Sequence, residues 1–236
     1  MASMAAPAPA AAGPSMAATP AHVSHCFATL HAQLAGEPAP TPSFEDALCP
    51  LFVTWMKIPG RLLDTYRSAD AKGHGDPRLA LRGCIGTLEP RRLHAALRDY
   101  TLNSALRDGR FQPVSLSELP SLECTVSLLT DFEVGAHYAD WDVGLHGIIV
   151  EFKGDGRGRH ADASGGRMYS ATYLPEIAAR EGWSHVETID SLVAKSGYRG
   201  RVDEALRRSI RLTRYQSSLC SLTHREWLGN GGAASH

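Results

Sequence analysis

The residues best suited to chemistry lie in the segment Leu81–Gly86, which reads LRGCIG. If this segment is a β-strand, alternate side chains point to opposite faces, so Arg82 and Cys84 share one face. A guanidinium beside a thiol favours the thiolate, which is the reactive form of cysteine. The neighbouring Gly83 and Gly86 leave room for a ligand or a second backbone. The pattern predicts a nucleophilic or redox cysteine that is assisted by an arginine.

Two structural alternatives stay open for the same segment. The alternation that pairs Arg82 with Cys84 places Leu81, Gly83 and Ile85 on the core face. Cysteine is among the most buried residue types, so Cys84 can be an inert packing residue. Arg82 can be held in a salt bridge. No His or Asp lies near enough in sequence to complete a Cys-His pair with Cys84, although a distant His can do so in space.

Two further residues are weaker candidates for catalysis. His146 lies in the sequence GLHGI on a predicted strand, where it can assist Cys84, bind a metal or serve as a structural histidine. Lys195 is a second candidate for assisting the thiol. The other histidines are scattered, without the HxH or HxxxH spacing of metal ligands, so no metal site is predicted. The sequence identifies no cofactor.

The segment from Arg199 to Arg214 is locally basic, and only Asp203 and Glu204 oppose its arginines. Such a segment can meet phosphates, or it can be a solvated face whose arginines pair with carboxylates. No aromatic platform for bases is interleaved with it, which favours the solvated face. The formal net charge of the chain is -1, so no overall field attracts nucleic acid. We expect no nucleic-acid partner.

The composition is that of a globular intracellular protein, with 43% hydrophobic and 21% charged residues among 236. The five cysteines are odd in number and form no CxxC pair, which indicates a reducing compartment. Neither a targeting signal nor a membrane span is predicted, so we expect a cytoplasmic or nuclear location. Residues 1–20 are rich in Ala and Pro and predict a disordered tail, 21–225 a folded domain, and 226–236 a flexible C-terminal tail.

Hydrophobic periodicity predicts an α+β fold with a mixed or antiparallel sheet, packed helices and two unequal subdomains with a cleft between them. Two polar, Gly-rich loops are expected over 59–78 and 153–168. A Ser-x-x-Glu capping box at Ser184 and Glu187 predicts a helix that ends at Gly197. The other expected helices cover 21–34, 90–108 (with proline in the first turn) and 175–181, and the expected strands cover 51–58, 79–85, 122–129, 143–152 and 210–215.

The LRGCIGT segment resembles the hallmark motif of the AMMECR family, and the chain is most similar to the eukaryotic branch. Other segments agree in order and spacing: PLFVTW (50–55), LRDYTLNSALRDGRF (97–111), WDVGLHGI (141–148), ATYLPEIA (171–178) and RLTRYQS (211–217). The resemblance implies a mixed fold in two unequal parts and no settled activity. It also implies, for the eukaryotic forms, an association with the nucleus and with gene expression. The loops at 59–80 and 153–168 are longer than the family pattern.

Two hypotheses of function follow. In the first, the domain handles or modifies a small molecule: Cys84 acts as a thiolate, Arg82 orients an anionic group, and Lys195 or His146 assists. In the second, the protein is a non-catalytic interaction protein with a regulatory role in gene expression. Its partner would then bind the polar loops or the Arg-rich segment. Substrate and oligomeric state do not follow from the sequence.

Overall fold

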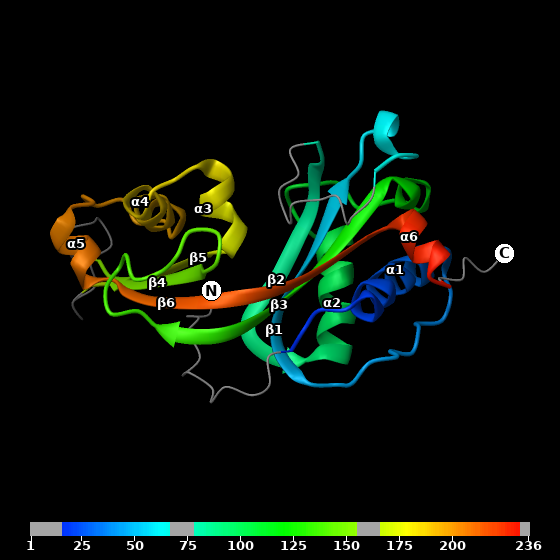
Figure 1. Ribbon diagram of the computed structural model, residues 1–236, viewed down its shortest axis with the longest axis horizontal. Helices are drawn as coiled ribbons and strands as arrows, with labels where there is room; N and C mark the ends of the chain where they lie inside the picture. Colours follow the sequence, from blue (N-terminus) through cyan, green and yellow to red (C-terminus); the bar gives the residue numbers. More distant parts are fainter. Residues whose placement is uncertain (1–15, 67–77, 155–165, 232–236) are drawn as a thin grey trace. The chain divides into compact units, whose positions relative to one another are not determined.

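The computed structural model describes residues 16–66, 78–154 and 166–231, and Figure 1 shows their arrangement in helices and strands. The helices are α1 (Pro20–Ala35), α2 (Leu93–Leu106), α3 (Pro175–Glu181), α4 (His185–Lys195), α5 (Glu204–Ser209) and α6 (His224–Gly229). The strands are β1 (Leu48–Lys57), β2 (Ala80–Arg92), β3 (Leu122–Val134), β4 (Gly147–Lys153), β5 (Met168–Tyr173) and β6 (Arg211–Thr223). The predicted α+β class is confirmed.

The strands form a six-stranded sheet in the order β2-β1-β3-β6-β4-β5. β1 pairs antiparallel with β2 and β3, and β4 pairs antiparallel with β5 and β6. The chain divides into two compact units. We call residues 131–217 the smaller unit, and residues 16–130 with 218–231 the larger unit. The cleft predicted between subdomains stays a prediction.

In the larger unit, α1 and α2 pack together and α2 covers β1 and β2 (Figure 1). α1 begins where the Thr19 hydroxyl and the His22 ring cap the first turn, and it ends at Gly36, whose φ of 73° suits glycine. Its apolar face is buried with the inward residues of the strands. This core contains Phe27, Leu30, Val53, Trp55, Leu97, Val126 and Trp227.

In the smaller unit, α4 packs against β4 and β5. The predicted capping box is present, because the Ser184 hydroxyl accepts from the Glu187 N–H and the Glu187 carboxylate accepts from the Ser184 N–H. Gly197 has the left-handed φ of 85° that ends this segment. The core of the unit contains Ile148, Val150, Phe152, Ile189, Leu192 and Leu212.

Several predicted bounds are wrong. Pro90 lies in β2 rather than in the first turn of a helix, because β2 continues to Arg92. The strand predicted from Val143 begins only at Gly147, so His146 lies in the preceding turn. Much of the two loops expected over 59–78 and 153–168 lies outside the described residues.

The folded domain also extends beyond both predicted boundaries, residues 21 and 225. Met16 and Ala18, expected in the disordered tail, contact the core of the larger unit, and the Ala18 N–H donates to Ser218 Oγ at 2.9 Å. The flexible tail predicted from residue 226 is wrong for Glu226–Gly229, because α6 buries Trp227 against Phe27. Residues 1–15 and 232–236 lie outside the described ranges.

In the described part of the chain, no helix combines the length and apolar character needed to cross a bilayer.

Candidate functional site

β2 carries a β-bulge inside the LRGCIG segment. Gly83 pairs with Trp55 of β1 and Leu81 pairs with Met56, so Arg82 is the extra residue. A bulge interrupts the strict alternation of side chains on which the predicted shared face of Arg82 and Cys84 was based, so that shared face stays a prediction. Leu81 is accordingly 39% exposed, and the prediction that it faces the core is wrong.

Gly83 lies directly against the backbone of α2. A Cβ added at this position would come within 2.0 Å of the Ser104 carbonyl oxygen, a distance that no side chain tolerates. Glycine therefore lets β2 approach α2 closely, and the second backbone expected beside this glycine is that of α2. This contact sets the distance between the bulged segment and α2, and it thereby positions Cys84, the next residue.

Cys84 is half-buried, and a neighbouring strand donates to its sulfur. Thr54 of β1 lies directly opposite Cys84, and its Oγ1 donates a hydrogen bond to Cys84 Sγ at 3.1 Å. The Thr54 side chain is buried. A hydrogen bond donated to sulfur is stronger when the sulfur is negative, so this contact favours the thiolate.

The backbone of Cys84 is held by two side chains that follow α2. β2 is an edge strand, and at Cys84 its outward N–H donates to Asp108 Oδ2 at 3.0 Å. The Arg110 Nη2 donates to the Cys84 carbonyl at 3.1 Å and pairs with Asp108 at 2.6 Å. These contacts satisfy peptide groups that an open sheet edge would leave to solvent.

The electrostatics of this contact place a cation beside Cys84. Hydrogen bonding to Arg110 lowers the pKa of Asp108 to about 2, so its carboxylate stays ionised at neutral pH. The pKa of Arg110 is raised, mainly by Asp108 and to a smaller extent by the charge of Cys84. Arg110 was not among the predicted site residues. The one feature of the sequence that could have indicated it is its place in the segment LRDYTLNSALRDGRF, which contributes to the family resemblance.

Arg82 is bound to a carboxylate through two of its nitrogens. Its Nε and Nη2 donate to Glu118 at 2.9 and 3.1 Å, and Lys57 Nζ donates to the same carboxylate at 2.8 Å. Hydrogen bonds from Arg82 and Lys57 lower the pKa of Glu118 to about 2. The third nitrogen, Arg82 Nη1, is buried and has no hydrogen-bond partner among the described residues.

The two weaker candidates lie in the smaller unit, whereas Cys84 lies in the larger one. His146 Nδ1 accepts the Asp142 N–H at 2.9 Å. Lys195 Nζ donates to the Thr172 carbonyl at 2.8 Å and lies 4.3 Å from the centre of the Tyr173 ring. Each residue thus has a local structural role, and the assistance to Cys84 stays a prediction.

The larger unit also contains two open hollows. One, of about 380 Å³, lies between α1, residues 37–43 and α6, and its lining includes His25, His31 and Glu37. The other, of about 360 Å³, follows α2 from Arg91 to Asn103. Neither lining includes Arg82 or Cys84. Within residues 16–66, 78–154 and 166–231, no group of three or more His, Cys, Asp or Glu side chains is arranged to hold a metal ion.

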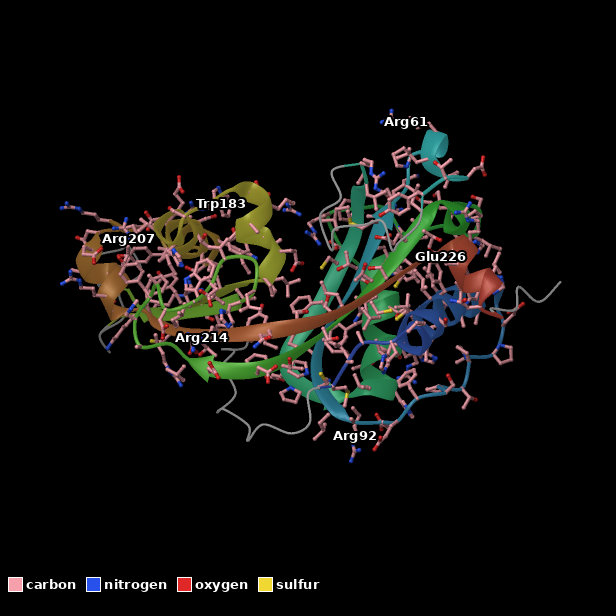
Figure 2. The ribbon with its side chains drawn as sticks, viewed as in Figure 1. Arg61, Arg92, Trp183, Arg207, Arg214 and Glu226 are labelled. Atoms are coloured by element: carbon pink, nitrogen blue, oxygen red, sulfur yellow. The ribbon has the colours of Figure 1, made fainter. Side chains whose placement is uncertain are left out.

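Most arginines of the basic segment pair with carboxylates. Arg207 donates to Asp190 at 2.7 and 2.8 Å, and Arg214 bridges Glu133 and Asp140 (both arginines are labelled in Figure 2). Arg208 pairs with Glu204, and Arg211 with Glu151. These pairs are those expected of a solvated face. That the segment binds no nucleic acid stays a prediction.

Fold and site together define an α+β protein of two compact units, in which a cysteine on a bulged edge strand is held by Thr54, Asp108 and Arg110. The family model AMMECR1 matches residues 23–220. The chain belongs to the AMMECR1 family.

The relatives described below carry no stated activity. An uncharacterised protein of Arabidopsis thaliana is 51% identical over 204 residues, which cover 86% of this chain and 85% of the relative. An uncharacterised protein of Schizosaccharomyces pombe is 40% identical over 162 residues, 69% of this chain and 76% of the relative. The crystal structure of the uncharacterised protein PH0010 from Pyrococcus horikoshii has the same fold, with a TM-score of 0.60 at 22% identity, covering 85% of this chain and 88% of that one.

Proposed function

We propose that the larger unit binds a small molecule through an anionic group at the LRGCIG strand, with Arg82 as the anion-binding residue and Cys84 as a reactive thiolate. The observation that carries the proposal is the buried Arg82 Nη1, which has no hydrogen-bond partner among the described residues. The non-catalytic role and the nuclear location remain alternatives from the sequence.

Arg82 suits an anionic ligand because it has an unsatisfied donor and because the local charge is positive. A buried donor that finds no acceptor costs about 1–3 kcal/mol, and more when it is charged. Two of the guanidinium nitrogens are satisfied by Glu118, and the third is available to an acceptor from outside the chain. Lys57 and Arg82 together carry one more charge than Glu118 neutralises. A carboxylate or phosphate is the acceptor that suits this donor best.

Cys84 combines partial exposure with contacts that stabilise a thiolate. The Thr54 hydroxyl donates to its sulfur, and the guanidinium of Arg110 is bound to its carbonyl. Reactive cysteines are partly exposed and have contacts that stabilise the thiolate, whereas buried apolar ones are inert. Cys49 illustrates the contrast, because burial raises the pKa of its thiol to about 11.

The test compares an anionic and a neutral alkylating reagent of similar size. Iodoacetate and iodoacetamide are each reacted with the full chain, and modification of the Cys84 peptide is followed by mass spectrometry. We expect wild type to favour iodoacetate, relative to free cysteine. Arg82→Gln should reduce the ratio of the two rates severalfold while changing the iodoacetamide rate little, because Lys57 still neutralises Glu118.

Arg98→Gln is the matched control, since Arg98 is exposed and pairs with Asp99 on the outer face of α2. This variant should keep the wild-type ratio. If Arg82→Gln fails to fold by circular dichroism, Arg82→Lys replaces it, because lysine keeps the charge and loses the forked geometry. The anion site would be contradicted if wild type showed no preference for iodoacetate, or if the Arg82 variant left that preference unchanged. Either result would favour the non-catalytic interaction protein.

A further inference from the structure

The smaller unit contains a carboxyl group that the proposed function does not use. Glu176 lies in the first turn of α3, within the segment ATYLPEIA. Both of its carboxyl oxygens are buried, and neither has a hydrogen-bond partner among the described residues. Buried carboxylates are almost always paired, so a carboxyl group without a partner indicates a neutral, protonated state.

The charged groups around Glu176 do not compensate for its burial. Arg180, on the same helix, attracts its charge but is bound to Glu181 at 2.9 Å. Tyr215 of β6 is the ionisable group whose charge opposes that of Glu176, and its phenol donates to the Tyr173 carbonyl at 3.1 Å. Burial raises the pKa of Tyr215, so the phenol stays neutral.

The other elements packed near α3 contribute little charge towards it. β4 packs on α3 with Ile148 and Val150, which share the apolar core with Ala178. Glu151, which follows Val150 in β4, pairs with Arg211. In the turn before β4, the ring of His146 is 3.6 Å from the Asp142 carboxylate.

Lys195 of α4 is another cation of the smaller unit. Its Nζ is engaged by the Thr172 carbonyl and the Tyr173 ring. Burial outweighs the lowering effects of the Glu176 backbone N–H and of Arg180, and it raises the pKa of Glu176 to about 7.

The helix that carries Glu176 is a short element with sharp ends. α3 has only seven residues, too few for a helix to be stable without tertiary contacts. It starts at Pro175, and it ends at Gly182, which has the left-handed φ of 68°. Both residues set sharp boundaries, so α3 can detach locally while the flanking β5 and α4 stay in place.

We propose that α3 is a proton-controlled element: it stays packed while Glu176 is protonated and opens locally when Glu176 ionises and its carboxylate becomes hydrated. Opening would separate the Glu176 carboxyl from Tyr215, whose phenol oxygen lies 2.9 Å from the Thr172 hydroxyl. The inference concerns the smaller unit alone and does not depend on Cys84.

The sign of the pH effect follows from the raised pKa. In the open state Glu176 titrates near its ordinary value of 4.5, whereas in the packed state it titrates near 7. The packed state of α3 is therefore most stable below pH 4.5, and it becomes less stable as the pH rises through about 7. The difference between the two values corresponds to a change on the order of a hundredfold in the opening equilibrium constant.

Hydrogen exchange measured by mass spectrometry tests the proposal on the full chain. The protection factor, the ratio of intrinsic to observed exchange rate, is determined for a peptide spanning 175–181 at pH 5 and pH 8. We expect wild type to lose protection by on the order of a hundredfold between these pH values. Glu176→Gln, which is neutral at both, should show no such loss.

Glu181→Gln is the matched control on the same helix, because Glu181 is exposed and should leave the pH dependence intact. Equal protection of wild type at both pH values would overturn the proposal. So would a Glu176→Gln variant that keeps the wild-type pH dependence. If that variant does not fold, carbon-13 NMR of the Glu176 carboxyl in wild type decides: a midpoint near 7 supports the proposal and one near 4.5 overturns it.

Discussion

Thr54 and Cys84 lie directly opposite each other on β1 and β2, and the Thr54 hydroxyl donates to the Cys84 sulfur at 3.1 Å. A threonine and a cysteine of similar size could pack in this position without any such contact. A hydroxyl at this distance can donate to the sulfur, so it gives the thiol a neighbour that stabilises negative charge. Cys84 is therefore more than a small apolar residue in a strand.

Gly83→Ala tests the close approach of β2 to α2. The added Cβ would lie 2.0 Å from the Ser104 carbonyl oxygen, which belongs to the helix backbone and cannot rotate away. We expect a loss of about 2 kcal/mol or more in the free energy of unfolding, measured by urea denaturation. Displacement of the strand should also weaken the hydrogen bond between Thr54 and Cys84.

Gly109→Ala is the control for this substitution. Apart from its chain neighbours Asp108 and Arg110, no described residue has a heavy atom within 4 Å of a Cβ built on Gly109. Its unfolding free energy should stay within about 1 kcal/mol of wild type. A Gly83→Ala variant as stable as Gly109→Ala would show that β2 does not require glycine at this contact.

Asp108→Asn tests how the edge of β2 is held. The variant keeps an oxygen that can accept from the Cys84 N–H but loses the ion pair with Arg110, and we expect it to be about 1–3 kcal/mol less stable at pH 7. Because the pKa of Asp108 is lowered to about 2, its contribution is complete above the ordinary value of 3.8 and is lost as the pH falls towards 2. The difference in stability between wild type and variant should therefore shrink below pH 4.

Asp99→Asn provides the comparison, since Asp99 is exposed and pairs with Arg98 on the surface. Its effect on urea unfolding should be below about 1 kcal/mol at every pH. An Asp108→Asn variant that behaves like Asp99→Asn would mean that the carboxylate does not hold the strand.

Local sequence signals predicted the elements whose determinants are local. The apolar spacing of Val23, Phe27 and Leu30 predicted α1, and the Ser184/Glu187 box predicted the start of α4. The short elements α5 and α6 lacked enough periodicity to be noticed. β5 lies at the edge of the sheet and was not predicted. Its short alternating pattern directly follows a Gly-rich stretch that was interpreted as a loop.

The candidate site was predictable only in part, for a physical reason. Alternation along a strand brought Arg82 and Cys84 to notice, but a bulge depends on pairing with β1 and leaves no local pattern. The cation at Cys84, Arg110, is 26 residues away in sequence. Contacts of this kind are set by how α2 packs on the sheet, which periodicity within one segment does not encode.

The most direct test of the account is the alkylation rate of Cys84 by iodoacetamide at pH 7, measured on its own peptide and compared with free cysteine. The account predicts that wild type reacts faster than free cysteine and that Thr54→Val reacts about three- to tenfold more slowly than wild type, as the loss of one hydrogen bond implies. Thr101→Val, equally buried and with its hydroxyl in no hydrogen bond among the described residues, should match wild type. A wild-type Cys84 that reacts no faster than free cysteine, with Thr54→Val unchanged, would contradict the reactive thiolate.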